Sequence, residues 1–193
     1  MARPREFDAN DALDKAMKVF WEKGYVNTSI DDLVNATGVN RYSLYEEFES
    51  KHGLFLASLD HYQNTVVRTM LGMIERPDAS LADIRAYFAM LAQVSSTEMG
   101  KQGCLMANSS SEVAPHDKRA ANKVEKFRAR LQAGFKNALS NANDNGELPT
   151  GFDVERSADF LTGIFLGVSV MARSGANPKM MANMVEVALS TLE

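Results

Sequence analysis

Apolar residues recur every three or four positions along almost the whole chain, whereas the strict alternation typical of a half-buried strand is almost absent. The first such stripe, within residues 10–23, consists of Leu13, Ala16, Met17 and Phe20. A period of three to four residues places these side chains on one face of a helix. The pattern therefore predicts an all-α protein.

Residues with a preference for helix ends divide this pattern into segments. Ser, Thr, Asp or Asn precedes most of the stripes as a potential N-cap, and glycine or proline follows several of them. We expect about nine helices, located at residues 10–23, 29–37, 40–48, 50 to about 74, from 80 past 91, about 103–113, about 117–143, 153 to about 173, and 177 to the C-terminus. No internal repeat or low-complexity segment interrupts them.

Two short helices joined by a glycine turn carry the most specific signal in the sequence. The turn is Thr37-Gly38-Val39, and the following helix opens with Asn40 and Arg41. This arrangement is typical of a helix-turn-helix unit, whose second helix enters the major groove of DNA with its N-terminal residues at the base edges. Arginine matches the acceptors of guanine or a phosphate, and asparagine can bind adenine or act only as the helix cap. A similar turn also occurs in ordinary helical bundles.

The residues around this unit resemble the N-terminal signature of the TetR/AcrR transcriptional regulators. The resemblance covers about residues 11–59 and rests on Phe20-Trp-Glu-Lys-Gly24-Tyr25-Val-Asn-Thr28-Ser29-Ile30, Gly38-Val39, Leu44-Tyr45-Glu-Glu-Phe48-Glu-Ser50-Lys51 and Leu54-Phe55. It implies a DNA-binding domain over residues 1–50 and a ligand-sensing and dimerisation domain over residues 51–193. It also implies a homodimeric repressor that a small-molecule inducer releases from a palindromic DNA operator.

The same resemblance assigns DNA contacts. The exposed positions of the recognition helix are Asn40, Arg41, Tyr42 and Ser43, and the contacts to the DNA include Thr28, Ser29, Tyr45 and Lys51. Tyr42-Ser43 departs from the small pair usual in the family, so the resemblance predicts no operator sequence.

The charge distribution does not by itself suggest a DNA-binding protein. The chain of 193 residues has a formal net charge of −4, and residues 1–60 hold seven basic and eleven acidic side chains. A negative net charge disfavours nonspecific attraction to DNA, so the acidic side chains must point away from the duplex. Arg3 and Arg5 resemble a basic arm for the minor groove, although a solvated chain end is an equal alternative.

The C-terminal two-thirds give weaker signals for a ligand site. Met70, Phe88, Cys104, Met106, Phe127 and Phe165 are candidates for the apolar wall of an inducer cavity. Cys104 is either a small buried side chain or a thiol that senses electrophiles or oxidants. Its place near a helix N-terminus favours the thiolate, whereas burial opposes it.

Small residues on the last two helices suggest where two chains meet. Gly163 and Gly167 lie on one side of their helix, and Met184 and Ala188 belong to the stripe of the final helix. The resemblance implies that the last two helices of each subunit form a four-helix dimer interface. The alternative interpretation is that these two helices pack only within their own chain.

Composition and missing motifs exclude other classes. The 45% hydrophobic and 24% charged residues are usual for a folded globular protein. A single cysteine forms no internal disulfide and no cysteine-type zinc site, so we expect no metal and no cofactor. Without an apolar leader or an uncharged run of about 20 residues, we expect a cytoplasmic protein and no membrane partner. A helical protein-interaction module and, less favoured, a cysteine-dependent enzyme stay as alternatives to a regulator.

Overall fold

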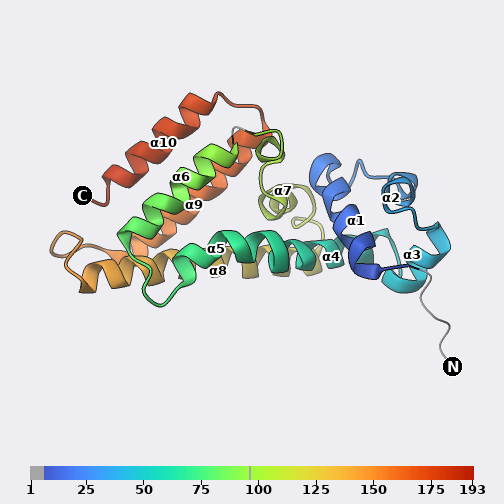
Figure 1. Ribbon diagram of the computed structural model, residues 1–193, viewed down its shortest axis with the longest axis horizontal. Helices are drawn as coiled ribbons and strands as arrows, with labels where there is room; N and C mark the ends of the chain where they lie inside the picture. Colours follow the sequence, from blue (N-terminus) through green and yellow to red (C-terminus); the bar gives the residue numbers. More distant parts are fainter. Residues whose placement is uncertain (1–6, 96) are drawn as a thin grey trace.

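A computed structural model describes residues 7–95 and 97–193, and every regular element in this part of the chain is helical. Figure 1 shows the N-terminal helices at one end, connected by a long helix to a larger bundle. The elements are α1 (Ala9–Lys23), α2 (Ile30–Thr37), α3 (Arg41–Phe48), α4 (Lys51–Tyr62), the π-helical segment η1 (Gln63–Val67), α5 (Arg68–Glu75), α6 (Leu81–Ser95), the 3₁₀ turn η2 (Gly100–Gln102), α7 (Leu105–Glu112), α8 (Lys118–Asp144), α9 (Val154–Arg173) and α10 (Pro178–Ser190).

The expected helix boundaries are confirmed almost throughout, because the caps are local features. The side chains of Ser29, Asn40, Ser50, Asp117 and Asp153 each accept a hydrogen bond from a backbone N–H in the first turn of the helix that follows. The backbone N–H groups in the first turn of a helix have no partner inside the helix, and a short polar side chain at the N-cap accepts their hydrogen bonds.

One long helix was expected from residue 50 to about 74, and α4, η1 and α5 form it without a break. Counted in this way, the described part of the chain contains nine α-helices and one 3₁₀ turn. The π-helical segment in its middle was not predicted. A π turn inserts one residue into the helical ladder and commonly marks a functional site in a helix.

The three N-terminal helices share a small core with the first turns of α4. The rings of Phe20 and Phe55 lie 5.2 Å apart in an edge-to-face contact, and Leu33 and Leu44 from α2 and α3 are fully buried. The predicted domain boundary between residues 50 and 51 therefore falls at the N-cap of a helix that packs on α1. This division of the chain stays a prediction.

The larger bundle is built around α8 and α9, which pack against each other, with α5, α6 and α10 around them. Its centre is aromatic, since the ring of Phe135 stacks on Phe88 at 5.5 Å and meets Tyr87 edge-on at 5.4 Å. In Figure 1, α7 lies between this bundle and α1. Two packed units thus meet at the C-terminal end of α1.

Candidate DNA-binding surface and ligand cavity

The turn between α2 and α3 has the geometry of a helix-turn-helix unit. Ser29 and Asp32 form a reciprocal capping box at the start of α2, and Gly38 ends it with a φ of 74°. A left-handed φ carries little strain only for glycine, so this position lets the chain reverse direction. The hydroxyl of Thr37 accepts a hydrogen bond from the N–H of Val39 and fixes the turn.

The N-terminal half of α3 presents polar and aromatic side chains to solvent. Tyr42 is 78% exposed, and the Arg41 guanidinium lies 5.3 Å from the centre of the Tyr45 ring. Asn40 accepts the N–H of Ser43 through its side-chain oxygen, so this oxygen is already used as the cap. Arg41 and Tyr42 are therefore the side chains of α3 that are most available to a partner.

The other predicted DNA contacts lie in different settings. The Thr28 side chain is buried, and its hydroxyl donates to the carbonyl of Gly24 at 2.5 Å, which leaves the hydroxyl no free approach to a phosphate. The Lys51 ammonium lies 4.5 Å from the centre of the Tyr25 ring, and partial burial lowers its pKa. The predicted basic arm of Arg3 and Arg5 lies outside the described residues.

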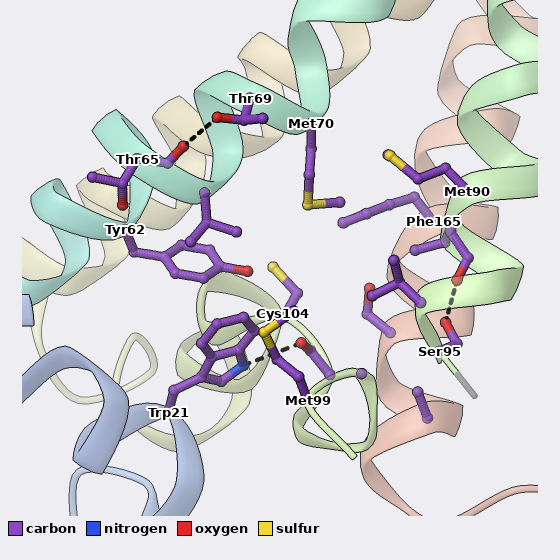
Figure 2. A pocket seen from close by; sticks show the side chains of 17 residues that line it. Trp21, Tyr62, Thr65, Thr69, Met70, Met90, Ser95, Met99, Cys104 and Phe165 are labelled. Carbon is purple, nitrogen blue, oxygen red and sulfur yellow. Dashed lines mark hydrogen bonds between the residues drawn. The ribbon is translucent and has the colours of Figure 1, made fainter. Parts of the chain in front are cut away.

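A cavity of about 380 Å³ opens between α1, the long helix α4–α5, α6, α9 and the segment before α7 (Figure 2). Three of the predicted wall residues line it, namely Met70, Cys104 and Phe165. Lining residues that sequence reasoning missed include Trp21, Tyr62, Thr65, Met90, Val94, Met99 and Ser169. Hydrophobic periodicity identifies buried faces, but it cannot tell which buried residue borders an empty space.

Three of the predicted wall residues are placed elsewhere. Phe88 and Met106 have no exposed surface and lie in the solid core, Phe88 against the ring of Phe135. The part of the cavity wall that α6 forms consists of Met90, Leu91, Val94 and Ser95 instead. Phe127 reaches only a small inner chamber behind the cavity, next to Phe165.

Cys104 lies in the cavity wall, but its environment does not favour a thiolate. Burial raises the pKa of the Cys104 thiol, and this effect exceeds the opposing one of the backbone N–H groups of Ala107 and Met106 at the start of α7. Of the two opposing effects that the sequence offered at this position, burial is therefore the larger. Lys101 does not compensate, because its ammonium is exposed and bound to Glu98.

Three hydrogen-bonding groups of the larger bundle hold the C-terminal end of α1, and we call them the α1 clasp. The indole N–H of Trp21 donates to the carbonyl of Gly103 at 3.1 Å. The Arg173 guanidinium donates to the carbonyls of Trp21 and Glu22 at 3.3 and 2.6 Å. The Glu112 carboxylate accepts the backbone N–H groups just after α1, those of residues 25 and 26, at 3.1 and 2.9 Å.

The small residues of α9 and α10 do not all face outward as the dimer prediction requires. A Cβ atom added at Gly167 would lie 2.8 Å from the methyl carbon of Met184, and Ala188 is buried, so these three residues pack within one chain. Gly163 is exposed and has no neighbour within 4 Å of such an atom. Large exposed apolar side chains accompany it on these helices, namely Phe160, Val170, Met180 and Val187.

Comparison with known proteins agrees with this geometry. The family model described as bacterial regulatory proteins, tetR family, matches residues 12–58, and the model described as tetracyclin repressor-like, C-terminal domain, matches residues 80–188. The HTH-type transcriptional repressor ComR of Escherichia coli (strain K12) is 36% identical over 98% of this chain and 90% of its own length. The chain belongs to the TetR family of transcriptional regulators.

Two further proteins show how far the likeness to TetR-family members extends. An uncharacterised HTH-type transcriptional regulator of Bacillus subtilis (strain 168), YezE, is 30% identical over the full length of both chains. A cysteine mutant of the TetR-family regulator CifR, solved in complex with a 26-bp operator duplex, is 26% identical. Its fold superposes with a TM-score of 0.86 over 99% of this chain and 100% of that chain. The similarity therefore includes both the helix-turn-helix unit and the bundle.

Family membership also identifies the partner. The relatives are transcriptional regulators, and the helix-turn-helix unit identifies DNA as the partner of this TetR-family chain. Within the described residues, no helix is both long and apolar enough to span a membrane. The same part of the chain contains no cluster of three metal-binding side chains among His, Cys, Asp and Glu.

Proposed function

We propose that this chain is a homodimeric repressor that binds a palindromic DNA operator and is released when a small molecule enters the 380 Å³ cavity. The observation that carries the proposal is the position of Trp21, which belongs to α1 of the helix-turn-helix unit and also lines the cavity. A regulator of this kind acts on the chromosome, so we place it in the cytoplasm.

At the operator, α3 enters the major groove with its N-terminal end. Arg41 reaches a guanine edge or a phosphate, Tyr42 contacts a thymine methyl or a sugar, and Ser43 and Tyr45 lie beside the backbone. Asn40 serves as the cap of α3, and Ser29 presents the N-terminus of α2 to a phosphate. Thr28 supports this approach by ordering the preceding turn, and Lys51 adds positive charge beside Tyr25.

The dimer brings two copies of α3 into successive major grooves about 34–36 Å apart. We place its interface on the outer faces of α9 and α10, where Gly163 permits close approach and the exposed Phe160 and Val187 supply apolar area. A large exposed apolar patch is typical of such contacts. Met184 and Ala188, with Gly167, fix the packing of α10 on α9 and act on the interface indirectly.

The α1 clasp supplies the route from ligand to DNA. A molecule in the cavity touches Trp21 and lies next to Gly103, the residue whose carbonyl holds the indole. Arg173 and Glu112 hold the adjoining backbone, so a shift at Trp21 moves the whole end of α1 relative to the bundle. A hundredfold preference of the ligand for the DNA-incompetent state corresponds to about 2.7 kcal/mol of coupling. Loss of one charge-assisted hydrogen bond is of this order.

The first experiment selects bound duplexes from a genomic pool and then measures affinity against salt concentration for two variants. Arg41→Ala is expected to lose about 1–3 kcal/mol on the selected operator and to relax preference at one base pair of each half-site. Lys51→Ala is expected to weaken operator and random DNA alike and to lower the salt slope by about one unit. Equal losses on both DNAs for Arg41→Ala would make it a phosphate contact, and failure to select any duplex would refute the proposed function.

A further inference from the structure

Behind the main cavity lies a second, much smaller space, which we call the inner chamber. Its volume is about 10 Å³, and it shares Tyr62, Met70, Cys104 and Phe165 with the cavity wall. A space of about 10–15 Å³ is the minimum that holds one water molecule, so the inner chamber has room for a single oxygen-sized atom. Figure 2 shows Tyr62, Met70 and Phe165 pointing inward around this end of the cavity.

Tyr87 also lines the inner chamber, and its hydroxyl is unusual. The side chain is completely buried, and the hydroxyl is the one buried side-chain polar atom without a hydrogen-bond partner among the described residues. Buried polar groups in folded proteins almost always have a partner, so a donor left unpaired calls for an explanation. Burial and the nearby Cys104 raise the pKa of Tyr87. The hydroxyl therefore stays protonated and can donate a hydrogen bond.

Three hydroxyl groups of the main cavity already have partners. Those of Thr65, Thr69 and Ser95 each donate to a carbonyl of their own helix, four residues earlier. Among the residues that the structure describes, no Asp, Glu, Lys, Arg or His contributes to the cavity wall. A charged ligand would lose its water here without gaining a counter-ion, which is strongly unfavourable.

We infer that the inducer is an uncharged, mostly hydrocarbon molecule that carries one acceptor oxygen of the carbonyl type, and that this oxygen enters the inner chamber and accepts the hydrogen bond of the Tyr87 hydroxyl. This inference rests on the proposed function, and it adds the chemical class of the ligand and a residue that determines specificity. A carboxylate fails because it is charged, and no cationic side chain among the described residues of the cavity wall would compensate for the water it loses.

Three probes of nearly equal shape separate these requirements, namely 2-nonanone, 2-methyl-1-nonene and nonanoate. The ketone and the alkene differ only in an oxygen replaced by a CH₂ group, and nonanoate adds the charge. Trp21 is the one tryptophan of the chain and lies in the cavity wall, so its fluorescence reports binding of each probe directly.

The wild-type protein is expected to bind 2-nonanone about tenfold more tightly than 2-methyl-1-nonene, as one newly satisfied hydrogen bond implies. Nonanoate is expected to bind most weakly at pH 8. In Tyr87→Phe, which removes the hydroxyl alone, the ketone should lose its advantage while the affinity for the alkene stays the same. Tyr62→Phe is the matched control, because the Tyr62 hydroxyl already has Cys104 as a partner, and this variant should keep the preference for the ketone.

Equal affinity for ketone and alkene in the wild type would overturn the inference, as would a preference for the ketone that survives in Tyr87→Phe or disappears in Tyr62→Phe. In each of these cases the alkene still binds, so the cavity stays a ligand site and the proposed function stands. If none of the three probes changes the fluorescence of Trp21, both the inference and the cavity as the inducer site are refuted. Operator binding by the ligand-free protein, measured in parallel, tests the DNA-binding half separately.

Discussion

Gly53, in the first turn of α4, is the glycine whose replacement gives the clearest quantitative test. A Cβ atom at this position would lie 1.9 Å from the carbonyl oxygen of Phe48, the last residue of α3. Since a comfortable contact needs well over 3 Å, the end of α3 must move by about 1 Å or more. The oxygen belongs to the backbone, and the backbone also fixes the position of a Cβ atom, so no side-chain rotation can relieve the overlap.

Gly72 is the matched control, because it belongs to the same continuous helix and has nothing within 4 Å of an added Cβ atom. Replacing an unhindered helical glycine by alanine stabilises a protein by about 0.5–1 kcal/mol. Overpacking costs about 1–3 kcal/mol, and a backbone overlap belongs at the upper end of this range. We therefore expect Gly72→Ala to gain about 0.5–1 kcal/mol and Gly53→Ala to lose about 2 kcal/mol.

Urea denaturation at one fixed protein concentration measures both variants, because the stability of a dimer depends on concentration. Gly53→Ala is also expected to bind the operator more weakly than Gly72→Ala, since the displaced residue ends the recognition helix. If the two variants unfold at the same urea concentration, the tight corner between α3 and α4 does not exist in solution, and the placement of α3 must be revised.

Three further predictions concern the interface, acid stability and the cysteine. Val187→Asp should sediment as a monomer and lose operator affinity. Val26→Asp, at a similarly exposed position just after α1, should stay dimeric. If Val187→Asp is also dimeric, the interface lies elsewhere. The Lys23 ammonium, followed by Ser29, lowers the pKa of Asp32 far below its ordinary value. The stability that this carboxylate gives is therefore complete at neutral pH, begins to fall below about pH 4, and is lost only when the carboxyl is protonated in the folded state, well below that pH. Asp32→Asn should unfold more readily than wild type at pH 7, and the difference between the two should shrink as the pH is lowered from 4 toward 2; a difference that stays constant over this range contradicts this. Because burial raises the pKa of Cys104, iodoacetamide should modify it slowly at pH 7 and faster above pH 9, and rapid labelling at pH 7 would show a reactive thiolate.

The sequence by itself determined the helices and the helix-turn-helix unit of this protein. Ser29, Asn40, Ser50 and Asp153 cap their helices as predicted, and Gly38 forms the turn, because caps and turns depend on residues within four positions of one another. The same local pattern carried the resemblance to the TetR family. These features needed no knowledge of which helices pack together.

Only the tertiary structure decided the walls of the cavity and the partners of the small residues. Trp21 reaches the cavity from α1, and the Tyr87 hydroxyl is left unpaired among residues brought together from the long helix α4–α5, from α6, and from α8 and α9. Gly167 faces Met184 of its own chain, and the burial of Cys104 outweighs its helix N-terminus. Each of these outcomes depends on cavities and on solvent exclusion, which arise only when helices distant in sequence pack together. Hydrophobic periodicity along one helix predicts neither of them.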